Sequence, residues 1–180
     1  MKLAPFSPYM SKPTPQSRQA ISSQIMNPSD EMTDQIIKGL VEILAIEGPT
    51  LSTRAFTQYG RKGGIVKMTR TAVQRFTKAL VKAKKDGKIL FEIDPCEEGV
   101  AYLLWLPTQE RVSVREYGNR GFEDIPASEL GEVLFTLADE MHDASDKTKL
   151  YAKIAELYGL KQLPKNATAR LDFVFQQYLA

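Results

Sequence analysis

The sequence predicts a mainly α-helical protein with one small β-hairpin, built as two helical units in tandem. Three observations favour this fold class. Apolar residues recur every three or four positions along six segments, which is typical of amphipathic helices. Two strand-like runs follow the third of these segments. A sequence segment that begins with Tyr-Gly also occurs twice without a gap, as YGRKGGIVKMTRTAVQRF (59–76) and YGLKQLPKNATARLDFVF (158–175), with Lys, Thr and Phe at the same spacing after the Tyr-Gly pair.

Length and composition are those of a globular protein with one medium domain or two small ones. The chain has 180 residues, of which 43% are hydrophobic and 26% are charged. Cys96 is the only cysteine, so no intrachain disulfide is possible and we expect a cytoplasmic location. We expect no membrane segment and no secretion signal, because no run approaches roughly 18 apolar residues.

Residues 1–28 are rich in Pro, Ser and Gln, and five prolines interrupt every candidate helix. We expect a flexible tail with at most a short helix around Ala20 to Met26. It would act as a linker or, alternatively, as an arm that binds a partner.

The first unit covers residues 29–107. Ser29 is the expected N-cap of its first helix and Ser52 that of a short second helix. The third helix is predicted from about Thr69 to Lys85, with one apolar stripe that includes Val73. The runs KILFEI and GVAYLLWL, joined by DPCEE, then predict a hairpin. Three helices followed by a hairpin is the order of a winged helix-turn-helix unit.

A connector, residues 108–124, leads to the second unit at residues 125–180. Pro126 lies near the start of its first helix, Ser145 is the expected cap of the next, and Asn166 introduces the last. The chain ends there, so this second helix-turn-helix unit lacks a complete wing. The overall prediction is therefore tandem winged helix-turn-helix units.

Charge is strongly segregated along the chain. Residues 54–88 contain eleven basic side chains and one acidic side chain, Asp86, whereas residues 89–146 contain fourteen acidic and three basic ones. An amphipathic helix needs a solvated face, which is the ordinary alternative, but such a face carries mixed signs. Eleven cations to one anion instead favour contact with a polyanion.

The basic residues of the third helix are expected to lie opposite its apolar stripe, where they would neutralise phosphates. Side chains of its first turns would reach base edges in the major groove. The pair Gly63-Gly64 would let backbone groups approach a phosphate. The predicted nucleic-acid-binding residues are Arg61, Lys62, Lys67, Thr69, Arg70, Thr71, Gln74, Arg75, Lys78, Lys82 and Lys85.

Two features complicate this prediction. The expected wing tip carries Asp94, Glu97 and Glu98, which phosphate would repel, so the wing either points away from the duplex or faces a basic protein surface. The last helix carries more aromatic residues than so short a helix usually hides. They either fill the core of the second unit or form a surface for a protein partner or a homodimer, with Phe173 and Tyr178 as the expected contacts.

Catalytic patterns are missing from the sequence. His142 is the sole histidine, so neither a Ser/His/Asp triad nor a zinc site is supported. The run GGIVKMT does not have the glycine and lysine spacing of a phosphate-binding loop. We therefore expect no enzyme activity, no cofactor and no metal.

Three short motifs give the chain a family resemblance over about residues 33 to 179. They are Glu47-Gly48-Pro49, Leu104-Trp105-Leu106, and Ile125-Pro126 with Glu129-Leu130. The chain resembles the tandem winged-helix-like C-terminal module of large bacterial helicase-related proteins that also carry a nuclease-like domain. The resemblance implies a module associated with nucleic acid and transfers no catalytic residue. The helicase motor and the nuclease-like domain have no counterpart in these 180 residues.

Two classes of function follow. The first is a double-stranded DNA-binding protein that acts as an accessory or regulatory factor. The second is a protein–protein adaptor whose basic helix docks an acidic partner. Structured RNA is a third, lesser alternative.

Overall fold

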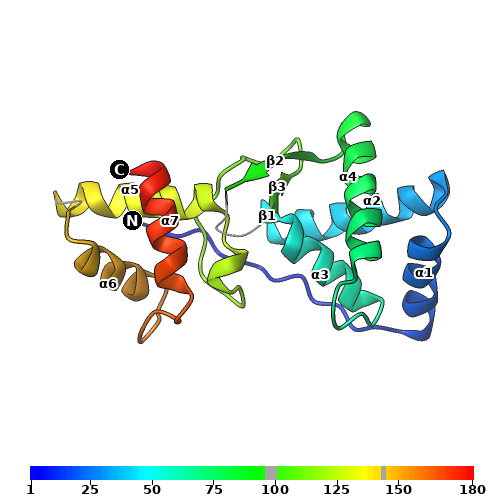
Figure 1. The fold of residues 1–180 in the computed structure, drawn as a ribbon, viewed down its shortest axis with the longest axis horizontal. Coiled ribbons are helices and arrows are strands. Elements are labelled where there is room, and N and C mark those ends of the chain that lie inside the picture. The colour runs from blue at the N-terminus through cyan, green and yellow to red at the C-terminus, as the bar shows by residue number, and fades with distance from the viewer. Residues whose placement is uncertain (96–100, 143–144) are drawn as a thin grey trace. The chain divides into compact units, whose positions relative to one another are not determined.

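The computed structural model describes residues 1–95, 101–142 and 145–180. Within these residues the chain is mainly helical with a small antiparallel sheet, which confirms the predicted class at that level (Figure 1). The elements in chain order are α1 (Pro15–Met26), α2 (Asp30–Glu47), β1 (Thr50–Leu51), α3 (Ser52–Lys62), α4 (Arg70–Lys85), β2 (Leu90–Asp94), β3 (Ala101–Trp105), the 3-10 helix η1 (Phe122–Asp124), α5 (Ala127–Met141), α6 (Lys147–Leu157) and α7 (Ala167–Tyr178).

The chain divides into two compact units whose segments interleave. The N-terminal unit consists of Ser7–Glu92 and Tyr102–Arg111. The C-terminal unit consists of Met1–Phe6, Ile93–Ala101 and Val112–Ala180. These boundaries differ from the consecutive ranges 29–107 and 125–180, because the first residues of the chain and the ends of two strands belong to the C-terminal unit.

In the N-terminal unit, α2 contacts α1, α3 and α4 (Figure 1). Its apolar residues recur at helical spacing and are almost completely shielded from solvent, including Ile36, Leu40 and Leu44. Phe76 of α4 is also fully buried, and its ring meets those of Phe56 and Tyr59 edge to face, with centroids 5.5 and 5.4 Å apart. The predicted core of this unit is therefore confirmed at these positions but not at Val73, which is 39% exposed.

The predicted hairpin is present as β2 and β3, and β1 joins it in the order β1-β3-β2. Thr50 and Leu51 of β1 pair with Leu104 and Leu103 of β3. Sequence patterning did not predict β1, because a strand of two residues is too short to show alternation.

The expectation of a flexible tail at residues 1–28 is wrong in this structure, where α1 covers twelve of these residues. Thr14 and Ser17 form a reciprocal capping box, and Pro15 lies in the first turn, where a missing N–H costs no hydrogen bond. Tyr9 is buried, and its backbone N–H donates to Oε1 of Glu47 at 3.0 Å. The prolines therefore mark the start of a helix instead of preventing one.

The predicted helix starts are partly confirmed. Ser29 caps α2, and its hydroxyl accepts a hydrogen bond from the backbone N–H of Met32. Ser52, however, is the first residue of α3, and its hydroxyl accepts from the N–H of Tyr102 in β3. Asp146, not Ser145, caps α6. A neighbouring residue supplies the cap in this last case, within the usual uncertainty of helix boundaries.

In the C-terminal unit, α5 contacts both α6 and α7, and η1 contacts α7. Leu130, Val133 and Leu134 of α5 are fully buried against Ile154 of α6 and Leu171 of α7. The apolar stripe expected on α5 is therefore confirmed at these positions. On α7, Leu171 and Val174 are buried as expected, but Tyr178 is 44% exposed.

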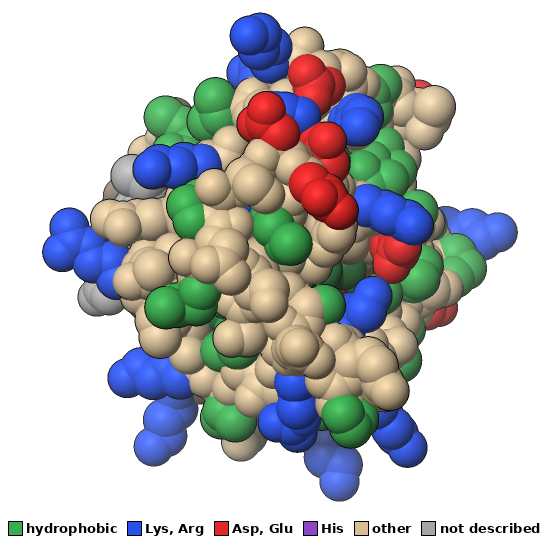
Figure 2. Space-filling model, turned by 90° about the vertical axis from the view of Figure 1, so that its right-hand side faces the viewer, with side chains coloured by type: hydrophobic (Ala, Val, Ile, Leu, Met, Phe, Trp, Pro, Cys, Tyr) green, Lys and Arg blue, Asp and Glu red, His purple; other side chains and the backbone are tan. Residues whose placement is uncertain are grey.

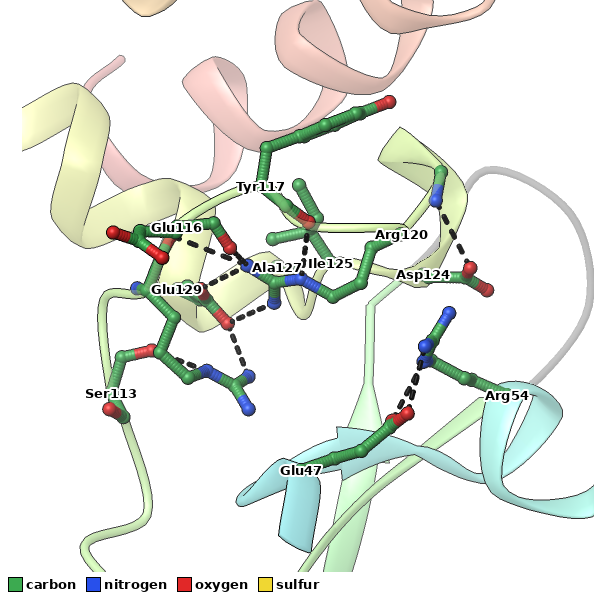
Figure 3. A network of polar contacts seen from close by, with 12 residues as sticks. Glu47, Arg54, Ser113, Glu116, Tyr117, Arg120, Asp124, Ile125, Ala127 and Glu129 are labelled. Atoms are coloured by element: carbon green, nitrogen blue, oxygen red, sulfur yellow. Dashed lines mark hydrogen bonds and ion pairs between the residues drawn. The ribbon is translucent and has the colours of Figure 1, made fainter. Parts of the chain in front are cut away.

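A buried ionic network joins the start of α5 to the preceding loop. Glu129 accepts hydrogen bonds from Arg115 at 2.6 Å and from Arg120 at 3.0 Å, and all three side chains are at most 5% exposed (Figure 3). The ring of Phe6 lies over Arg120, with the guanidinium carbon 4.6 Å from its centroid. The N-terminal residues of the chain are thereby held in the C-terminal unit.

Asp94 does not form an exposed acidic wing tip, which corrects the prediction. It is 2% exposed, accepts from the backbone N–H of Ala127 at 3.0 Å, and is 3.2 Å from Nη2 of Arg170. The carboxylate lies at the first residue of α5, where the helix dipole also favours negative charge. Glu97 and Glu98 lie outside the described residues.

Candidate nucleic-acid interface

The local sequence explains why α4 presents one polar face to solvent. Thr69, where the third helix was predicted to start, caps the helix by accepting from the N–H of Ala72. Ala72, Phe76 and Ala79 recur at helical spacing and are buried against α2 and α3. The last turn is rich in lysine, which complements the negative end of the helix dipole. Because these buried residues lie on one side of α4, the opposite side of the helix is exposed to solvent.

Five of the predicted cations are exposed, and none of them forms an ion pair within the described part of the chain. We call this set, together with the α4 surface between its members, the basic face. It consists of Arg61, Lys67, Arg70, Lys78 and Lys85. Figure 2 views the molecule from the side that carries α1, where Lys and Arg side chains stand around most of the margin and the acidic side chains lie in the upper part and toward the right.

Three neutral side chains of the predicted interface lie at the start of α4. Thr71 and Gln74 are exposed and belong to the first turns of the helix. Thr69 is exposed as well, but its hydroxyl already accepts the capping hydrogen bond at 3.2 Å. A hydroxyl retains its proton as a donor, so this group still offers one hydrogen bond to a ligand.

Arg75 is not available as a ligand-binding residue, which corrects the prediction. It is 7% exposed, and its Nε donates to the carbonyl oxygen of Gln24 at 2.9 Å. Its position on α4 lies between the polar and apolar halves. Because α1 covers that side, the guanidinium holds the end of α1 instead of facing solvent.

Lys82 and Lys62 are already paired with carboxylates. Nζ of Lys82 is 2.5 Å from Oδ1 of Asp34 and 3.2 Å from Oδ2 of Asp86. The hydrogen bond with Asp34 raises the pKa of Lys82, and the same bond lowers the pKa of Asp34. Nζ of Lys62 is 3.6 Å from Oε2 of Glu42. These two cations would have to give up a partner to meet a phosphate.

The Gly63-Gly64 pair does not offer free amides to a phosphate. The N–H of Gly63 donates to the carbonyl of Gly60 and that of Gly64 to the carbonyl of Arg61, each at 2.9 Å. The N–H of Ile65 also donates to Gly60. These bonds close the end of α3, which is why the expected backbone cradle is absent here.

The sequence reasoning missed Val81, which is 59% exposed on the basic face. It follows Arg70 by eleven residues, about three helical turns, and so lies on the same side of α4. Val73 was expected in the buried stripe but is 39% exposed. Helical periodicity contained this signal for Val81, which is out of phase with Phe76 and Leu80. It did not for Val73, which precedes them by three and seven residues and is in phase with both.

The two aromatic residues predicted to bind a partner are engaged within the C-terminal unit. Phe173 is half-buried against its core. Tyr178 is 44% exposed, but its ring covers Gly131, where an added Cβ would lie 2.8 Å from ring atoms. Most of this aromatic surface therefore packs on its own unit.

Other kinds of site find no support in the described residues. They contain no group of three or more His, Cys, Asp or Glu side chains that could hold a metal ion. An open pocket of about 230 Å³ lies between α1, α2 and α3, but two of its charged side chains, Lys62 and Glu42, pair with each other. In the part of the chain that the structure describes, no helix is both long and apolar enough to cross a membrane.

Comparison with protein-family models, with curated proteins and with solved structures gives no match to this chain. The resemblance to the helicase-associated module therefore stays a prediction.

Proposed function

We propose that the protein binds double-stranded DNA through the basic face of α4, which acts as the recognition helix of a winged-helix unit. The order of elements supports this reading, since a helix, a strand and two further helices are followed by two strands. So does the sheet order β1-β3-β2, in which β1 completes the hairpin sheet. The observation that carries the proposal is the set of five exposed cations without carboxylate partners among the described residues.

The length of α4 suggests that one part of its polar face contacts bases and another part contacts phosphates. Arg70 and Lys85 are fifteen positions apart, which corresponds to roughly 22 Å along a helix axis. This length exceeds the width of the major groove, about 12 Å. The first turns would therefore enter the groove, with Thr71 and Gln74 toward base edges, while Lys78 and Lys85 would meet phosphates along its margin.

The biological role follows as an accessory or regulatory factor in DNA metabolism, with no catalytic step of its own and no resident cofactor. The family resemblance favours this role. A cytoplasmic location is part of the same proposal.

A gel shift with a mixed DNA ladder at low salt tests the proposal. The wild-type protein should retard duplex DNA, and the variant R70E/K78E should lose at least about 60-fold in affinity, because two phosphate contacts are removed. The matched control is K161E/K165E, which reverses two exposed lysines of the C-terminal unit and should bind normally. No retardation by micromolar wild-type protein would defeat the proposal.

One observation favours the alternative function of a protein–protein adaptor. Val73 and Val81 place apolar area between the cations of α4, and Val66 in the preceding loop is 98% exposed. Such a mixture also suits an acidic amphipathic partner. If the variant R70E/K78E/K82E loses a partner protein while its DNA retention stays unchanged, the adaptor function replaces DNA binding.

A further inference from the structure

The two glycines between α3 and α4 make close contact with α1. A Cβ added to Gly63 would lie 2.7 Å from Cγ2 of Ile21, which is itself buried. A Cβ added to Gly64, whose φ is +75°, would lie 2.7 Å from Cζ of Arg18. The hydroxyl of Ser17 also donates to the carbonyl of Lys62 at 2.6 Å. The glycines therefore allow α1 to pack on this loop.

This packing brings a cation from a distant part of the sequence to the loop between α3 and α4. Arg18 is the only charged residue of α1, and it is exposed. Its guanidinium lies against Gly64, in the loop that follows Arg61 and Lys62 at the end of α3 and contains Lys67. Within the described residues its side chain makes no hydrogen bond and no ion pair. Its N–H donors are therefore available to a ligand, while the contact with the loop restricts where they can lie.

We infer that Arg18 is a further phosphate-contact residue, which acts together with Arg61 and Lys67; this inference rests on the proposed DNA binding. A guanidinium presents a planar fork of N–H donors that matches the oxygens of a phosphate. A cation that the fold holds at the loop loses less side-chain entropy on binding than one that moves freely. The residue was missed in the sequence because residues 1–28 were expected to form a tail.

The test is the salt dependence of duplex DNA binding, measured by fluorescence anisotropy with the full chain. The variant R18A should lower the slope of log K against log salt by about 0.9 and bind about eightfold more weakly at 0.1 M salt, because one phosphate contact is lost. R18K keeps the charge and should retain most of the slope. Two controls are Q19A, on the same exposed turn of α1, and K161A, which removes one cation from the C-terminal unit.

The outcomes separate the two proposals. If the wild-type protein does not bind duplex DNA, the proposed function fails. If it binds and R18A has the slope of the wild type, Arg18 makes no contact and only this inference fails. The inference also fails if R18A and R18K weaken binding equally and both lower the melting temperature, because Arg18 would then serve only to hold α1 on the loop.

Discussion

In the helix pairs α3–α4 and α6–α7, similar sequence segments run from the end of the first helix through the second helix. The second helices, α4 and α7, nevertheless differ in which residues they bury and which they expose. In the first pair, Phe76 is fully buried and the opposite side of α4 carries exposed cations. In the second, the matching Phe175 is only half-buried, and Nζ of Lys147 lies 4.5 Å from its ring centroid. The buried residues of α7 include Leu171 and Val174 instead.

The matched segment preserves the helix–loop–helix path, while burial of the last helix differs at one aromatic position. In register, Ala72 and Leu171 are both buried, and so are Arg75 and Val174. Phe76 is fully buried, however, whereas Phe175 is only half-buried. Lys147, Lys149 and Lys153 of α6 are each paired with a carboxylate, whereas the five cations of the basic face have no carboxylate partner among the described residues.

Truncation of the two matching phenylalanines should give the largest contrast. F76A should lower the free energy of unfolding by about 3–5 kcal/mol, because it leaves a cavity in a closed core. F175A should cost clearly less, since its ring is partly exposed and leaves no enclosed void. Urea unfolding of both variants measures this difference. Equal losses of unfolding free energy would mean that both phenylalanine rings fill closed cores, which would contradict the difference in their burial.

The buried arginines provide the next contrast. Arg170 donates to the carboxylate of Asp94 and to the carbonyl oxygens of Pro95 and Ile125. R170A should cost about 3–5 kcal/mol, because it leaves a buried carboxylate without its cation. R75A removes only hydrogen bonds to carbonyl oxygens and should cost about 1–3 kcal/mol. Thermal unfolding that ranks R75A as the more damaging variant would contradict this account.

A smaller effect is expected where a carboxylate competes with DNA for a lysine. D34N removes the closest anionic partner of Lys82 and should strengthen duplex binding by at most about eightfold at 0.1 M salt, since one more cation becomes available. Its control is E31A, which removes an exposed acid from the first turn of the same helix. Unchanged affinity in D34N, measured by anisotropy, would show that Lys82 lies outside the interface.

The smallest expected effect concerns Asp172 of α7. A hydrogen bond from the hydroxyl of Tyr151, 2.7 Å long, lowers the pKa of Asp172 below its usual 3.8, and Lys147 contributes less. This carboxylate therefore stabilises the fold above pH 3.8, and its contribution is lost as pH falls through the lowered pKa. Y151F should raise the pKa of Asp172 more than K147A does, as followed by NMR of the side-chain carboxyl carbon. The opposite order would exclude the tyrosine as the main cause.

The sequence predicted the helices of the two units and the hairpin because long amphipathic patterns and caps such as Ser29 are local signals. It also predicted correctly that five cations are exposed, which lie on α4, on the loop before it and at the end of α3. It did not predict the fates of Arg75 and Asp94, because their partners lie on segments far away in the chain. Long-range packing also stabilises α1 as a helix, although the prolines around it, taken by themselves, indicated a flexible tail.

Figure 1 makes the origin of these errors visible, since the N-terminal segment runs beside elements that follow it by many residues. Ala4 forms a parallel bridge with Arg115, and Tyr9 bonds to Glu47. A pattern of apolar and polar residues carries no information about which distant segment will cover it. Lys62 and Lys82 show the same limit, because their partners Glu42 and Asp34 lie on α2.

The most direct test of the central claim is the salt dependence of duplex DNA binding by the wild-type protein. Five exposed cations predict that log K falls with log salt with a slope of about −4.5, or about −5.4 if Arg18 also contacts the backbone. R70E/K78E should remove at least about two contacts from that slope, and K161E/K165E should leave it unchanged. A wild-type slope near zero, or no binding at low salt, would contradict the assignment of the α4 face to DNA.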